Sequence, residues 1–168
     1  DGDARAGAEQ LERAIEIAPG HLVASMNLAL VRLDQARPED AVALVEPLRR
    51  VHPNDLRIAN TLAQALAAAG RFDDAAREWR ASVDIQPTQE AVWAGWSTAA
   101  SAAGRHAEAI AILREGLTKL PASVLLQGTL AWELATAPGA DLRQGPEALA
   151  LAEAVVRAMP AFGQGYDI

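Results

Sequence analysis

Proline recurs at a fixed spacing along this chain, and that spacing constrains the fold more than any other feature. Pro19, Pro53, Pro87 and Pro121 stand 34 residues apart. A globular enzyme fold has no need of proline at such a period, whereas a stack of similar helical units does. The period therefore predicts an array of repeats, in which each repeat buries its apolar face against its neighbours.

Small residues follow the same period. Three sets of phased positions are occupied by alanine, glycine or serine: Ala36, Gly70 and Gly104; Ala41, Ala75 and Ala109; and Ala29, Ala63, Ser97 and Ala131. In the first copy, Gly2 and Gly7 stand at the places of the first two sets. Small side chains at fixed positions of a repeat allow neighbouring helices to approach closely.

Apolar residues between the prolines are spaced as on helices. Leu62, Ala63, Leu66 and Ala69 form one stripe, and Gly70 follows it as a helix C-terminal glycine does. Each phased proline ends the second helix of a repeat, because it lacks an amide donor. We expect helices at 3–18, 22–35, 38–52, 56–69, 72–86, 90–103, 105–119, 123–137 and 146–159. Pro47 lies inside one of them and should kink it or cost about 3 kcal/mol.

This pattern resembles the tetratricopeptide repeat. The segment from Gly70 to Ala75, followed by Trp79 and Pro87, is similar to the family's second helix, and Trp93 stands at the place of its first-helix tryptophan. The resemblance implies an all-α fold, a right-handed α-solenoid of antiparallel helix pairs with a 34-residue repeat. We expect one repeat domain over 1–168, made of a partial repeat 1–21, repeats 22–55, 56–89 and 90–123, a repeat with an insertion 124–161, and the start of a further repeat 162–168.

The last full repeat departs from the period. Pro121 and Pro160 are 39 residues apart, and the extra five residues fall at 138–145. This stretch is similar to a variant near the C-terminal end of many bacterial arrays. Residues 1–18 supply only a second helix, and 161–168 look like the start of a first helix. We therefore expect the chain to be a piece of a longer protein.

Composition narrows the function classes. The net charge of −7 argues against nucleic-acid binding, which depends on neutralising phosphates. No run of 18 apolar residues occurs, so no membrane span is expected in this segment. Without cysteine there is neither a disulfide nor thiolate chemistry. These features fit bacterial cytoplasm and periplasm alike, and usage rich in alanine and arginine indicates a bacterial source.

The sequence contains no arrangement of residues that indicates catalysis, so we expect no enzymatic activity and no cofactor. His21, His52 and His106 are expected in solvent-exposed turns; His21 and His52 could share one end of the stack, but a metal site would need further ligands. Asp73 and Asp74 open a helix, where carboxylates favour the positive end of its dipole.

The resemblance implies that first helices line a concave groove in which an extended peptide binds. Repeat phase places sixteen residues there: Val23, Met26, Asn27, Leu30, Arg57, Asn60, Thr61, Gln64, Ala91, Ala94, Gly95, Thr98, Leu125, Gly128, Thr129 and Trp132. The candidate partner-binding residues are Asn27, Arg57, Asn60, Thr61, Gln64, Thr98, Thr129 and Trp132; the alternative is that they are only solvated. Amide side chains both donate and accept, which suits a peptide backbone. No groove lysine is present, so a clamp for a C-terminal carboxylate is not expected.

The four tryptophans fall into two groups. Trp79, Trp93 and Trp96 occupy core phases of their helices, and we interpret them as packing residues. Trp132 lies on the groove side, where it either anchors a ligand or packs against the inserted loop; we expect packing.

Two function classes fit these features. The first is a non-catalytic scaffold that binds a protein or peptide partner in its groove. The alternative is a repeat segment of a larger enzyme, such as a glycosyltransferase or sulfotransferase, that presents substrate to a distant site; flanking sequence would distinguish the two. Apolar residues at the ends, Leu11, Ile15, Tyr166 and Ile168, could in addition drive weak self-association.

Overall fold

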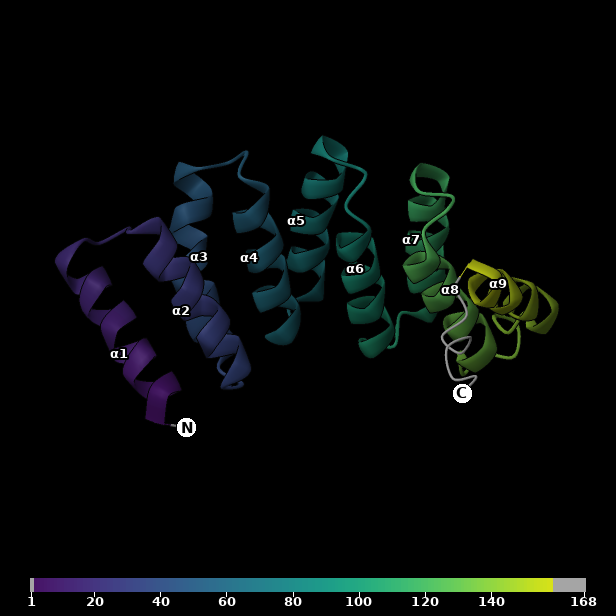
Figure 1. Ribbon diagram of the computed structural model, residues 1–168, viewed down its shortest axis with the longest axis horizontal. Coiled ribbons are helices and arrows are strands. Elements are labelled where there is room, and N and C mark those ends of the chain that lie inside the picture. The colour runs from purple at the N-terminus through teal and green to yellow at the C-terminus, as the bar shows by residue number, and fades with distance from the viewer. Residues whose placement is uncertain (1, 159–168) are drawn as a thin grey trace, which may run out of the picture. The chain divides into compact units, whose positions relative to one another are not determined.

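The computed structural model describes residues 2–158, with side chains from residue 6, and this part of the chain is entirely helical (Figure 1). Its nine helices are α1 (Gly2–Ile17), α2 (Leu22–Asp34), α3 (Pro38–Val51), α4 (Leu56–Ala68), α5 (Phe72–Ile85), α6 (Glu90–Ala102), α7 (His106–Lys119), α8 (Val124–Thr136) and α9 (Gly145–Ala158). Every helix boundary lies within one residue of its predicted position, so the helix assignment is confirmed. None of these helices is long and apolar enough to cross a bilayer.

The helices group into two compact units, Asp1–Ile85 and Gln86–Ile168. In the N-terminal unit each helix packs on the next, and α4 also contacts α2. In the C-terminal unit α6, α7, α8 and α9 pack in the same sequential way, and α8 also contacts α6. Thus α2, α4, α6 and α8 are the first helices of their repeats, and α4 and α8 each rest on both helices of the repeat before.

The first helices α2, α4 and α6 end in the same backbone motif. Ala36, Gly70 and Gly104 have positive φ angles of 55°, 75° and 75°. In each case the backbone N–H of the following residue donates to the carbonyl five residues earlier, as Arg71 N–H does to the Leu66 carbonyl at 2.8 Å. This is the Schellman arrangement, which satisfies carbonyls that a helix end leaves open. Glycine or alanine therefore recurs at these positions because the backbone there has a positive φ angle.

The phased prolines lie just beyond the second helices, as predicted. Pro19, Pro53, Pro87 and Pro121 each follow the last helical residue by two positions. Pro47 behaves differently, because α3 continues through it. Both Pro47 and Ala43, whose carbonyl loses its usual amide partner, are exposed. Water can therefore satisfy that carbonyl.

The other two sets of small residues lie in the core. Ala29, Ala63, Ser97 and Ala131 are buried, and Ala41, Ala75 and Ala109 are completely inaccessible. Such positions have no room for a larger side chain, because protein interiors are close-packed.

Trp79, Trp93 and Trp96 are buried, as expected. The rings of Trp93 and Trp96 stack with centroids 6.0 Å apart. The indole N–H of Trp93 donates to the Pro87 carbonyl at 2.8 Å. One repeat later the side-chain amide of Gln127 donates to the Pro121 carbonyl at the same distance.

The insertion forms the connection between α8 and α9, where the sequence placed it. Ala137 is buried, and the backbone N–H of Gln144 donates to the Leu134 carbonyl at 3.1 Å. The connection is therefore fastened to the end of α8 before α9 begins. The predicted role of Pro160 and the expected repeat 162–168 lie outside the described residues.

Candidate binding surface

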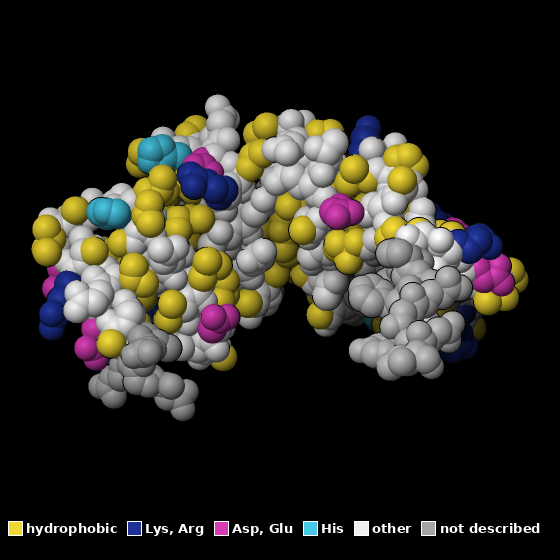
Figure 2. All heavy atoms as spheres, in the orientation of Figure 1, with side chains coloured by type: hydrophobic (Ala, Val, Ile, Leu, Met, Phe, Trp, Pro, Cys, Tyr) yellow, Lys and Arg dark blue, Asp and Glu magenta, His cyan; other side chains and the backbone are white. Residues whose placement is uncertain are grey.

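The candidate residues of the N-terminal unit lie on α2 and α4, with different exposure. Asn27 and Gln64 are exposed, and Asn60 is half-buried. Thr61 is only 8% exposed, so its side chain lies in the core. The apolar residues Val23 and Leu30 on α2 are exposed beside Asn27. Apolar side chains reach the surface of both units on the face shown in Figure 2.

The side chain of Arg57 pairs with a neighbouring residue at the start of α4. Its guanidinium forms an ion pair with Asp55 at 2.9 Å, although 76% of the arginine side chain is exposed. Asp55 also caps α4 by accepting from the Arg57 amide at 2.9 Å. The hydrogen bond from the Arg57 side chain is the main cause that lowers the pKa of Asp55, and in turn Asp55 raises the pKa of Arg57. A negative group on a ligand would therefore compete with Asp55 for this guanidinium.

In the C-terminal unit, three candidate residues line one pocket. Thr98 on α6 and Thr129 and Trp132 on α8 border a cavity of about 320 Å³ between these two first helices. The side chain of Trp132 is 70% exposed, so the expectation that it packs against the inserted loop is wrong.

The same pocket is bordered by a buried carboxylate that the sequence analysis missed. Glu133 on α8 is only 6% exposed. Ser101 Oγ donates to its Oε2 at 2.9 Å, and His106 Nδ1 lies 2.6 Å from its Oε1. Because an ionised carboxylate only accepts hydrogen bonds, the histidine carries a proton on Nδ1. His106, expected in an exposed turn, is thus half-buried and joins α7 to α8.

Serine, histidine and glutamate meet here, but not as a nucleophilic relay. In a catalytic triad the serine contacts one ring nitrogen and the carboxylate the other. Here Ser101 Oγ and Glu133 Oε1 both lie near the same nitrogen, Nδ1 of His106, at 3.2 Å and 2.6 Å. The serine proton goes directly to the carboxylate. The cluster therefore supports helix packing and shapes the pocket wall.

Repeat phase contains the signal that would have found Glu133. The equivalent positions in earlier repeats are Val31, Ala65 and Ala99, and none of them is charged. A carboxylate in a phase otherwise filled by small apolar residues indicates a buried partner. His106 stands in the phase of Phe72, which is buried.

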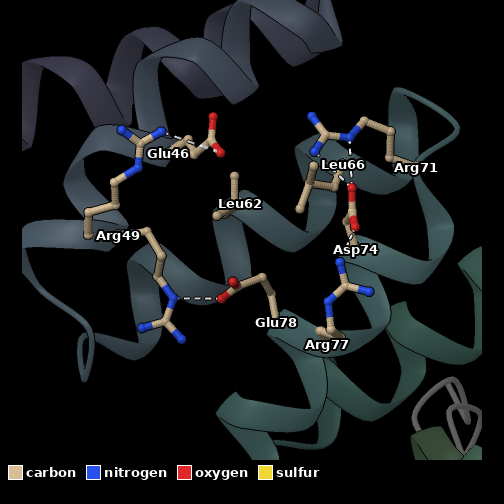
Figure 3. Close-up of a pocket in the computed structure, with 9 residues that line it drawn as sticks. Glu46, Arg49, Leu62, Leu66, Arg71, Asp74, Arg77 and Glu78 are labelled. Atoms are coloured by element: carbon tan, nitrogen blue, oxygen red, sulfur yellow. Dashed lines mark hydrogen bonds and ion pairs between the residues drawn. The ribbon is translucent and has the colours of Figure 1, made fainter.

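A second, strongly charged pocket of about 240 Å³ lies in the N-terminal unit, over Leu62 and Leu66 of α4 (Figure 3). Its arginines are paired with acids from α3 and α5: Arg49 with Glu78 at 2.6 Å, Arg50 with Glu46 at 3.6 Å, Arg71 with Asp74 at 2.8 Å, and Arg77 with Asp74. The Arg71 hydrogen bond is the main cause that lowers the pKa of Asp74. Each arginine has an acidic partner, and the Arg49–Glu78 pair joins α3 to α5, so these charges support helix packing.

An apolar groove of about 580 Å³ lies between α8 and α9. Small residues form its floor, including Gly128, Ala131 and Ala148, and Trp132 borders it as well as the polar pocket. Leu149 and Val156 on α9 are 61% and 70% exposed. The indole of Trp132 thus separates a polar pocket from an apolar groove.

The other histidines have local roles. His21 caps α2, where its Nδ1 accepts from the Ala24 amide at 3.2 Å, and His52 is exposed at the end of α3. Within residues 2–158, no three histidine, cysteine or acidic side chains cluster as metal ligands would.

Taken together, the paired helices, the Schellman ends and the exposed first-helix faces define a helical repeat protein with a surface for macromolecular contacts. A family model described as tetratricopeptide repeat matches residues 1–65 and again 33–95. The chain belongs to the tetratricopeptide repeat family.

Solved structures of MamA have a similar fold. A crystal structure of MamA matches with a TM-score of 0.74 at 13% identity, covering 93% of this chain and 88% of that one. MamA from Desulfovibrio magneticus RS-1, residues 41 to the end, gives a TM-score of 0.74 at 11% identity over 93% and 85% of the two chains. A structure of MamA AMB-1 gives 0.69 at 16% identity over 93% and 89%. At this level of identity the likeness concerns the fold. No curated protein matches the sequence.

Proposed function

We propose that this chain is a non-catalytic scaffold that binds an extended segment of a protein partner on the exposed faces of its first helices. The observation that carries the proposal is family membership together with the polar side chains that α2 and α4 expose. Asn27 and Gln64 are exposed and offer amide groups that can pair with a peptide backbone in both directions. Asn60 is half-buried on the same helix as Gln64, with its Oδ1 inaccessible to solvent. The arrangement of Ser101, His106 and Glu133, which is not that of a triad, supports a non-catalytic role.

The decisive experiment truncates two amides of α4. The partner is first captured with the full chain and identified, and its affinity is then measured for the double variant Asn60→Ala and Gln64→Ala. Unpaired polar groups in a bound interface cost about 1–3 kcal/mol. We therefore expect binding to weaken at least tenfold, which corresponds to about 1.4 kcal/mol, with an unchanged circular dichroism spectrum.

The matched control removes two polar side chains from second helices. Gln10 on α1 and Glu39 on α3 are both exposed, so the double variant Gln10→Ala and Glu39→Ala should bind the partner as the parent chain does. Glu78 is unsuitable as a control, because it pairs with Arg49. If the α4 variant binds normally and the control variant does not, the partner lies on the second helices and the proposal is wrong.

A further inference from the structure

The pocket between α6 and α8 has walls with an unusual hydrogen-bonding character. Four hydroxyl groups border it, and each donates its proton to another group of the protein. Ser97 and Thr98 donate to the Ala94 carbonyl at 2.8 Å and 2.9 Å, and Thr129 donates to the Leu125 carbonyl at 2.8 Å. Ser101 donates to Glu133 at 2.9 Å. A hydroxyl that has donated its proton has only lone pairs left to offer.

Glu133 adds a negative charge to these acceptors. It borders the pocket and is nearly buried, and its ion-pair partner among the described residues is His106. Its carboxylate oxygens lie 2.6 Å from His106 Nδ1 and 2.9 Å from Ser101 Oγ. A nearly buried carboxylate is stabilised by each further donor or cation that approaches it, so a cation entering the pocket would be attracted to Glu133.

Trp132 supplies the third element of recognition. Its indole borders the pocket and is mostly exposed, so the ring is accessible to a ligand. The face of an indole attracts a guanidinium or ammonium group through its quadrupole. Apart from the indole N–H, the polar groups on these walls are acceptors, and an anionic ligand would find little to bind.

We propose that this pocket binds a basic side chain, an arginine or lysine, on the partner segment that lies along α6 and α8. The inference rests on the proposed function, since it names a recognition element of that partner. Guanidinium and ammonium groups bear donors only, five and three respectively, and so complement walls of acceptors. The volume of about 320 Å³ is at the lower end of the range for ligand pockets, about 300–1,000 Å³, and suits one side chain. The net charge of −7 favours the approach of a basic partner.

The position of the pocket indicates what stands next to that basic residue. Trp132 also borders the apolar groove between α8 and α9. A segment whose basic side chain enters the pocket would therefore bring its neighbouring residues to an apolar surface. The preferred partner sequence is one in which arginine or lysine is followed or preceded by apolar residues.

The test uses peptide probes and the full chain labelled with ¹⁵N. Ac-Gly-Arg-Gly-NH₂ is titrated against the protein, and the matched probe carries citrulline, which has nearly the same shape without the charge. We expect the arginine peptide to shift the Trp132 indole N–H signal and the amide signals of Thr98 and Thr129. The citrulline peptide should bind at least tenfold more weakly.

Glu133→Gln tests the charge within the protein. This variant keeps the shape of the side chain and should weaken binding of the arginine peptide at least tenfold. Glu108→Gln makes the same change on a half-buried carboxylate of α7 that pairs with Arg105 outside the pocket, and it should leave the titration unchanged. If Glu133→Gln disturbs folding, Trp132→Leu replaces it; because this ring is exposed, the fold should persist and binding should weaken by about threefold.

Three results would overturn the inference: equal binding of the citrulline peptide, parent-like binding by Glu133→Gln in a folded protein, or no shift of the three signals. Failure of the proposed function gives a different result. The Asn60→Ala and Gln64→Ala variant leaves the pocket intact and should still bind the arginine peptide, whatever its effect on the captured partner.

Discussion

Ala36 shows at a single residue how the backbone, rather than packing, selects a side chain. It adopts a φ of 55° at the end of α2, where the equivalent positions are Gly70 and Gly104. The left-handed region places Cβ close to the following carbonyl, which costs about 1–2 kcal/mol for residues other than glycine. This alanine keeps the Schellman hydrogen bonds, so its strain is balanced by the helix end that it completes.

Replacing this alanine should stabilise the protein. We expect Ala36→Gly to raise the free energy of unfolding by about 0.5–1 kcal/mol, since relief of strain exceeds the added entropy of the unfolded chain. Gly70→Ala and Gly104→Ala should lower it by a similar amount, and Gly70→Val by more, because a β-branched residue resists this conformation. A Cβ at either glycine meets no atom within 4 Å, so conformation is the sole cause tested. Urea denaturation measures all four variants; a loss of stability in Ala36→Gly would contradict this account.

At the scale of the helix, packing between α6 and α7 depends on the absence of a side chain. Gly116 begins the last turn of α7, and a glycine inside a helix normally weakens it. A Cβ there would lie 2.9 Å from Trp93 Cγ and 3.1 Å from a methyl carbon of Leu126. Both neighbours are completely or almost completely buried and cannot move aside. Close approach of the two helices therefore requires this glycine.

Gly116→Ala tests this requirement. Overpacking costs about 1–3 kcal/mol, which exceeds the gain of up to about 1 kcal/mol in helix propensity. We expect a net loss in the free energy of unfolding, measured by urea denaturation. Gly95→Ala on α6 makes the same change where nothing lies within 4 Å, so this control should gain stability. Equal effects of the two substitutions would mean that contact with Trp93 does not matter.

At the scale of the whole molecule, the described residues form an apolar groove between α8 and α9. Leu11 and Ile15, which we expected to drive self-association, are half-buried, whereas Leu149 and Val156 on α9 are exposed. The expected contributions of Tyr166 and Ile168 lie outside the described residues. Exposed apolar patches commonly mark contact surfaces, and the groove between α8 and α9 is thus the surface through which weak association of this chain is expected.

Sedimentation velocity over a wide range of concentration measures that association. We expect the parent chain to show a concentration-dependent increase in sedimentation coefficient, and Leu149→Lys to abolish it, since a charge in the groove would have to be desolvated. Leu125 is an exposed residue of α8 that does not line the groove between α8 and α9. Leu125→Lys is therefore the matched control and should associate as the parent does. A parent chain that stays monomeric at every concentration would refute the expectation.

The sequence by itself determined the helices and their ends. Phased prolines and glycines act through local backbone geometry, which depends on a residue and its near neighbours, so helix ends such as Leu66–Arg71 could be placed from spacing alone. Phase also identified the buried Trp93 and the connection around 138–145, because each repeat packs as the one before it does.

Only the tertiary structure decided the chemistry of the candidate surface. Ser101, His106 and Glu133 belong to three different helices, and the sequence does not state that their polar atoms converge. The same holds for Trp132, whose exposure depends on what the neighbouring helix leaves uncovered, and for Arg57, whose charge is shared with Asp55. Such interactions depend on angles and distances between helices, and the repeat period fixes which faces meet but not which side chains touch.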